Sequence, residues 1–167
     1  MPTIDNIPKR RLPSPPPSTP KWDVRVVKKN AAVVLKKPWS EGLQDSIIAA
    51  DMISKSTLSQ KNRIALILVD STLEIAYKEY LVNEKSIGIA AFSRLATRAD
   101  IQKEVLKHIS VSAATVKQIE YYYKLRNDLI HQRATPNISP EQVQKYREIV
   151  ERLLKKMFGL KFDYETT

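Results

Sequence analysis

The chain has 167 residues, of which 43% are hydrophobic, so it is long enough for one domain with a buried core and a tail. It has no cysteine, three glycines and two histidines, which argues against disulfides, thiolate or histidine-rich metal sites and glycine-rich phosphate loops. No apolar run approaches the ~18 residues of a membrane span. We therefore expect a cytoplasmic protein with no metal, no cofactor and no membrane association.

The first residues are basic and rich in proline. Residues 1–39 carry nine Lys and Arg against two Asp, whereas the rest of the chain carries 19 Lys and Arg against 16 acids. Residues 1–20 hold seven of the ten prolines, which predicts an irregular arm that is partly polyproline II. We assign residues 1–38 to this arm or linker. It either adds sequence-independent affinity for nucleic acid or is a solvated tail.

Residues 22–27 within the arm alternate apolar and polar side chains, which predicts a short strand. Because a single strand is not stable alone, the segment either docks on the domain, on a partner or on a second copy, or stays loose.

Helical periodicity and capping residues then predict an all-α bundle of four main helices plus a short helix over residues 39–160, followed by a tail at 161–167. The main helices are expected at 40–57, 59–82, 112–133 and 140–158, and the short one at 99–109. Ser40 is the expected N-cap of the first. The last has the clearest boundaries, with Ser139 as N-cap, Pro140 at N1, Gln142 completing a capping box and Gly159 as the stop.

The most informative stretch lies near the end of the helix at 112–133. On a helical wheel Arg126 falls within an apolar sector, where a guanidinium is costly unless it is paired or faces a cleft. Two acids of the second helix are candidate partners, because Asp70 projects into that helix's buried sector and Glu74 lies one turn further, at the edge. Asn127 and His131 are four residues apart and share one edge of the motif helix.

These residue types suit metal-free cleavage of RNA. An imidazole transfers protons near neutral pH, and a guanidinium binds phosphate oxygens bidentately and stays charged. Arg126 and His131 lie about 140° apart on an ideal helix, so one copy makes a sparse site. Two copies related by a two-fold axis would pool two sets of residues across a shared cleft, and a homodimer is expected for this reason.

The run Arg126-Asn127-Asp128-Leu129-Ile130-His131 resembles the Arg-x(4–6)-His signature of HEPN domains, and the order of helices over residues 40–158 is similar as well. The resemblance implies a dimeric α-helical domain that acts as a metal-independent endoribonuclease in a toxin or phage-defence system. Arg126 and His131 would be catalytic, with Asn127, Asp70 and Glu74 in support.

Single-stranded RNA, an antitoxin or a larger defence protein would be the partners implied by this resemblance. Toxins regulated by a nucleotidyltransferase usually carry a tyrosine two residues after the histidine, where this chain has Arg133. The alternative is a non-catalytic HEPN module that binds RNA or nucleotides or mediates protein assembly.

Overall fold

The computed structural model describes residues 21–131 and 137–162, and this part of the chain consists of α-helices and one π-helical turn, without strands. The predicted all-α fold class is confirmed. The Pro-rich segment 1–20, Arg133 and residues 163–167 lie outside the described residues. No helix within the described ranges is long and apolar enough to cross a membrane.

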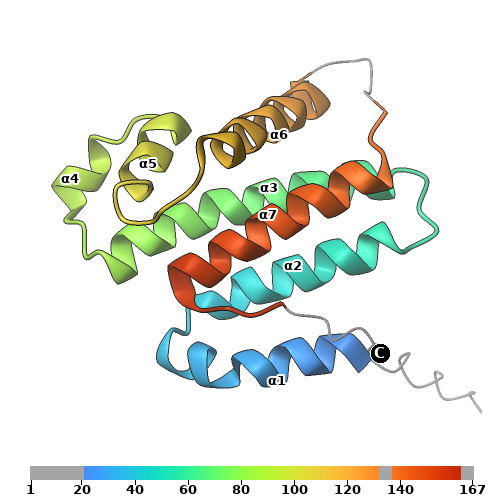
Figure 1. The fold of residues 1–167 in the computed structure, drawn as a ribbon, viewed down its shortest axis with the longest axis horizontal. Helices are drawn as coiled ribbons and strands as arrows, with labels where there is room; N and C mark the ends of the chain where they lie inside the picture. The colour runs from blue at the N-terminus through green and yellow to red at the C-terminus, as the bar shows by residue number, and fades with distance from the viewer. Residues whose placement is uncertain (1–20, 132–136, 163–167) are drawn as a thin grey trace, which may run out of the picture.

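The central helix of the bundle is α3 (Lys61–Glu79). It contacts α2 (Ser40–Ser54), α5 (Arg98–Val105), α6 (Ala113–His131) and α7 (Pro140–Phe158). Figure 1 shows α2, α3 and α7 running alongside one another, with α6 on the side of α3 and α7 that is away from α1. Chain segments far apart in sequence therefore meet on α3.

The boundaries of α7 are those expected from its capping residues. The Ser139 hydroxyl accepts a hydrogen bond from the Gln142 backbone amide, the Gln142 side chain accepts from the Ser139 amide, and Gly159 adopts a left-handed conformation at φ 81°. The expected N-cap of α2 is wrong. Ser40 is already helical and donates its hydroxyl to the carbonyl of Lys37, so Trp39 occupies the cap position.

The end of α3 departs from a regular helix. Residues Tyr80–Glu84 form the π-helical turn η1, in which the Lys85 amide donates to the Tyr80 carbonyl at 3.0 Å. The short helix α4 (Ile89–Ser93) follows and leads to α5. A capping box between Thr97 and Asp100 starts α5, which fixes the direction in which its first turn points.

The strand predicted at 22–27 is wrong, because this segment lies in α1 (Lys21–Lys36). No strand is available to pair with it in the described part of the chain, whereas a helix brings Val26, Asn30 and Val33 to one face against the domain. Asn30 is fully buried, donates to the Lys161 carbonyl at 3.0 Å and accepts from the Lys161 amide at 2.8 Å. The segment thus docks on the domain.

The folded body is therefore longer at both ends than the predicted 39–160. It includes α1, and it includes the residues after α7, where Leu160 and Phe162 are buried. Asn30 joins these two ends, because its side chain on α1 makes both hydrogen bonds to the Lys161 backbone. Lys161 lies in the segment after α7, which is neither helix nor strand, so its backbone groups need partners of this kind.

Candidate functional site

Asp70 lies at the centre of a buried group of charged and polar side chains. Its carboxylate is fully buried and receives hydrogen bonds from three other helices. Arg98 donates from Nη1 and Nη2 at 2.6 and 2.8 Å, Arg126 donates from Nε at 2.8 Å, and the Tyr146 hydroxyl donates at 2.5 Å. Since a buried carboxylate is stable only when its oxygens are paired, Asp70 joins α5, α6 and α7 to α3.

Sequence reasoning did not identify Arg98, which is the most buried cation of this group. Only 6% of its side chain is exposed, and its guanidinium lies 4.1 Å from the centre of the Tyr123 ring. Burial acts to lower the pKa of Arg98, but the hydrogen bonds and charge of Asp70 outweigh it, so the pKa is raised and the group stays charged. The available signal was its place in the first turn of α5, where a cation opposes the helix dipole and needs a nearby acid.

Arg126 is paired with both of the acids that the sequence singled out. Its Nε contacts Asp70, its Nη2 donates to Glu74 Oε2 at 3.1 Å, and its Nη1 donates to Asn127 Oδ1 at 3.2 Å. The side chain is 15% exposed. The structure therefore resolves the choice between an acid and a cleft in favour of the acids within one copy of the chain.

Glu74 is the outermost acid of the group, with 30% of its side chain exposed. The Lys78 ammonium lies 2.9 Å from Glu74 Oε1. The pKa of Glu74 is lowered, first by the hydrogen bond from Lys78 and then, against the effect of burial, by the positive charges of Lys78, Arg98 and Arg126. Glu74 is thus a carboxylate held charged at the surface end of the cluster.

His131 lies apart from this cluster. It is the last residue of α6 and is exposed, and within the described residues no hydrogen bond or ion pair joins it to Arg126 or Asn127. Arg63 caps the same end of α6, since its Nη2 donates a hydrogen bond to the Leu129 carbonyl at 2.8 Å. A cation at a helix C-terminus also interacts favourably with the helix dipole. The structure brings Arg126, Asn127, Asp70 and Glu74 together, and the catalytic assignment of Arg126 and His131 stays a prediction.

Apolar side chains also lie along α3, the helix that carries Asp70 and Glu74. Ile64, Ile67, Leu68 and Ile75 share one side of α3 by their helical spacing, and we call this side the α3 face. Ile64 and Ile75 are exposed, and the other two are half-buried. Ile130 is exposed on α6, one turn beyond Arg126. Ile67 and Leu68 also pack against the core, so the exposed aliphatic side chains here are Ile64 and Ile75 on α3 and Ile130 on α6.

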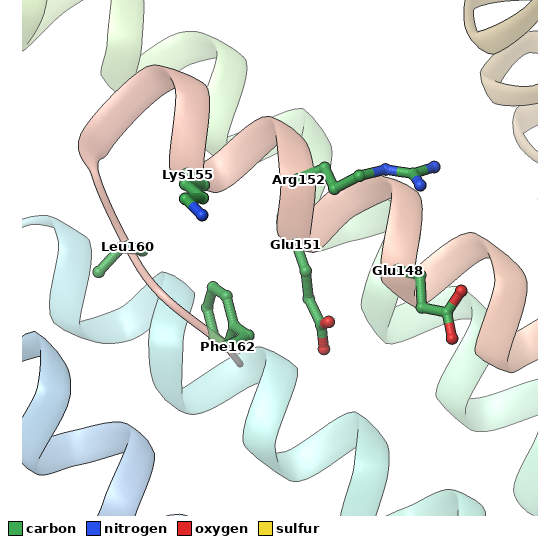
Figure 2. Close-up of a pocket in the computed structure, with 6 residues that line it drawn as sticks. All are labelled: Glu148, Glu151, Arg152, Lys155, Leu160 and Phe162. Atoms are coloured by element: carbon green, nitrogen blue, oxygen red, sulfur yellow. The ribbon is translucent and has the colours of Figure 1, made fainter. Parts of the chain in front are cut away.

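Two of the hollows on the protein differ in the charge of their walls. One, of about 240 Å³, adjoins it between α5 and α6 and has Arg98, Lys103 and Tyr123 in its walls. Figure 2 shows the other, of about 290 Å³, where Leu160 and Phe162 lie near α7. The lining of that second hollow also contains two acids and two bases, Glu148, Glu151, Arg152 and Lys155. The charges of that second hollow are balanced, whereas the first hollow has two bases and one acid, Glu120, in its walls and so carries a small excess of positive charge.

No family model matches the sequence, and neither a curated protein nor a solved structure matches the chain.

Proposed function

We propose that the protein is a metal-independent endoribonuclease of the HEPN type that cleaves single-stranded RNA through a site shared by two copies of the chain. The observation that carries the proposal is the layout of α6. Arg126 and Asn127 are hydrogen-bonded to each other, His131 is exposed at the end of the same helix, and Ile130 on α6 and Ile64 and Ile75 on α3 are exposed aliphatic side chains.

The reaction needs two proton transfers and one charge-stabilising group. One imidazole accepts the proton of the ribose 2′-hydroxyl while the 2′-oxygen bonds to phosphorus. The bond from phosphorus to the 5′-oxygen breaks, and a second imidazole protonates that oxygen, leaving a 2′,3′-cyclic phosphate and a 5′-hydroxyl. His131 of two copies would supply both imidazoles, and Arg126 would offset the charge on the phosphorane.

The proposed dimer is held by the α3 face and Ile130. Burying these aliphatic side chains against their symmetry mates removes apolar surface from water at roughly 25 cal/mol per Å². It also brings two α6 helices towards one axis, so that two Arg126–His131 sets can serve one RNA strand. We place this effector in the cytoplasm, as a toxin or phage-defence protein controlled by an antitoxin or by a larger defence protein.

The test is RNA cleavage in the presence of EDTA. We expect the wild-type chain to cut single-stranded RNA to products with 2′,3′-cyclic phosphate ends, and the His131→Ala variant to lose at least about a hundredfold in rate, the usual share of one acid–base group. His108→Ala is the matched control, because it removes the other histidine and should cut at the wild-type rate. Intact RNA at high wild-type concentration, or equal cutting by the two variants, would refute the nuclease.

A non-catalytic HEPN module is the second candidate, and the pairing of Arg126 supports it. Both Asp70 and Glu74 occupy the guanidinium, so it can stabilise the fold without ever meeting a phosphate. This candidate predicts RNA binding that is unchanged by His131→Ala, no cleavage by any variant, and binding that weakens steeply with salt.

A further inference from the structure

The carboxylate of Glu74 lies among three cationic side chains. Lys78 Nζ is 2.9 Å from Oε1, Arg126 Nη2 is 3.1 Å from Oε2, and Arg98 Nη1 is 4.0 Å from Oε2. Lys78 is four residues from Glu74 on α3, whereas Arg126 on α6 and Arg98 on α5 are brought to Glu74 by the tertiary fold. Two guanidinium groups and an ammonium around one anion form a suitable site for phosphate oxygens.

Glu74 and Asp70 have different roles in this group. Asp70 is fully buried and all four of its hydrogen bonds come from the interior, so removing it would leave buried charges unpaired. Glu74 is 30% exposed, and its partner Lys78 is 44% exposed. A part-exposed carboxylate can turn into water at little cost because solvent replaces the lost contacts.

Movement of Glu74 would change the local charge without disturbing the core. Asp70 continues to neutralise Arg98 through two hydrogen bonds. The Nη2 edge of Arg126 and the ammonium of Lys78 would then be without an acid at the surface end of the cluster. A phosphodiester is an anion of similar oxygen geometry, and it would fit between them.

We propose that Glu74 occupies the subsite for an RNA backbone phosphate and that RNA binds at Arg126 and Lys78 by displacing this carboxylate. Glu74 acts as an internal competitor that lowers affinity for RNA, and Lys78 becomes a substrate-binding residue. The inference rests on the proposed function for the identity of the ligand, since that function places RNA at Arg126.

The test measures binding of a fluorescein-labelled single-stranded RNA by anisotropy, in the His131→Ala background so that cleavage is slow during the measurement. Glu74→Gln should tighten binding about fivefold, the equivalent of one part-exposed ion pair. Glu79→Gln is the matched control, because it makes the same charge change five residues along the chain, where Glu79 accepts a hydrogen bond from Asn83. It should change affinity less than about twofold.

Two further variants test whether the tighter RNA binding of Glu74→Gln depends on Arg126 and on the position of the carboxylate. Adding Arg126→Ala to Glu74→Gln should abolish the tighter binding, because the phosphate then lacks its guanidinium. Glu74→Asp withdraws the carboxylate by one methylene and should give an intermediate affinity. Equal tightening by Glu74→Gln and Glu79→Gln would reduce the effect to net charge and overturn the proposal, as would a gain that survives without Arg126.

The source of the phosphate is tested with inorganic phosphate as a competitor. If inorganic phosphate competes with an inhibition constant as low as the dissociation constant of the labelled RNA for Glu74→Gln, at constant ionic strength, the subsite prefers a free anion and the RNA assignment is wrong. Failure of the two proposals can be told apart. A wild-type chain that does not cleave RNA refutes the proposed nuclease function. An RNA affinity that is unchanged by Glu74→Gln refutes the proposal that Glu74 competes with RNA.

Discussion

Replacing Asp70 by asparagine should destabilise the protein more than any other single change at the site. The asparagine keeps the shape of the side chain but carries no charge, and its amide group donates hydrogen bonds where Asp70 only accepts them. Arg98 is 6% exposed and donates twice to Asp70, so its charge would stay buried with no hydrogen-bonded acid, and Glu74 Oε2, 4.0 Å from Nη1, would be its remaining ion-pair partner. Arg126 would retain Glu74.

The expected cost follows from this difference in burial. Removing one partner of a buried ion pair costs about 3–5 kcal/mol, because the remaining charge cannot regain its hydration. For a chain of this size, that loss corresponds to a melting temperature lowered by roughly 6–20 °C. Glu74→Gln, at the part-exposed end of the same cluster, should cost less than about 1 kcal/mol.

Urea unfolding followed by circular dichroism measures both values. The Arg98→Met variant and the double variant with Asp70→Asn complete a cycle, in which we expect a coupling energy of at least about 2 kcal/mol. A loss below about 1 kcal/mol for Asp70→Asn, or a coupling near zero, would refute the conclusion that this ion pair holds α5 on α3.

Three further predictions concern other parts of the fold. The pKa of Tyr146 is raised by burial and then by the charge of Asp70, so the folded state keeps the neutral phenol and stability should fall as pH rises above the ordinary value of 10.0. Tyr146→Phe should reduce that alkaline slope in urea titrations, and an unchanged slope would remove Tyr146 from the account. Asn30→Ala should cost about 1–3 kcal/mol of unfolding free energy, because it removes two hydrogen bonds between the buried Asn30 side chain and the Lys161 backbone, and a neutral result would mean that α1 docks without them. Ser139→Ala should cost about 1 kcal/mol of unfolding free energy through the lost N-cap of α7, with Ser139→Thr as a control that retains it.

Local sequence signals were sufficient where the physics is local. The α7 boundaries follow from Ser139, Pro140, Gln142 and Gly159, because capping hydrogen bonds and a positive φ involve only neighbouring residues. The strand predicted at 22–27 is wrong because alternation over a few residues is a weak signal. A local pattern also cannot tell whether another strand is available to pair with the segment. The face of α1 that carries Asn30 was decided by contact with the domain.

For the site, the sequence by itself determined that Arg126 needs an acid or a cleft and that Asp70 and Glu74 are the candidates, because helical spacing fixes which side of a helix each residue occupies. The tertiary structure decided that both acids bind Arg126 and that Arg98 shares them. Residues 28 apart along the chain meet only when α5 packs on α3, and no local pattern encodes that contact. Arg126 is thus one of two arginines in the cluster, and the buried carboxylate of Asp70 accepts hydrogen bonds from both.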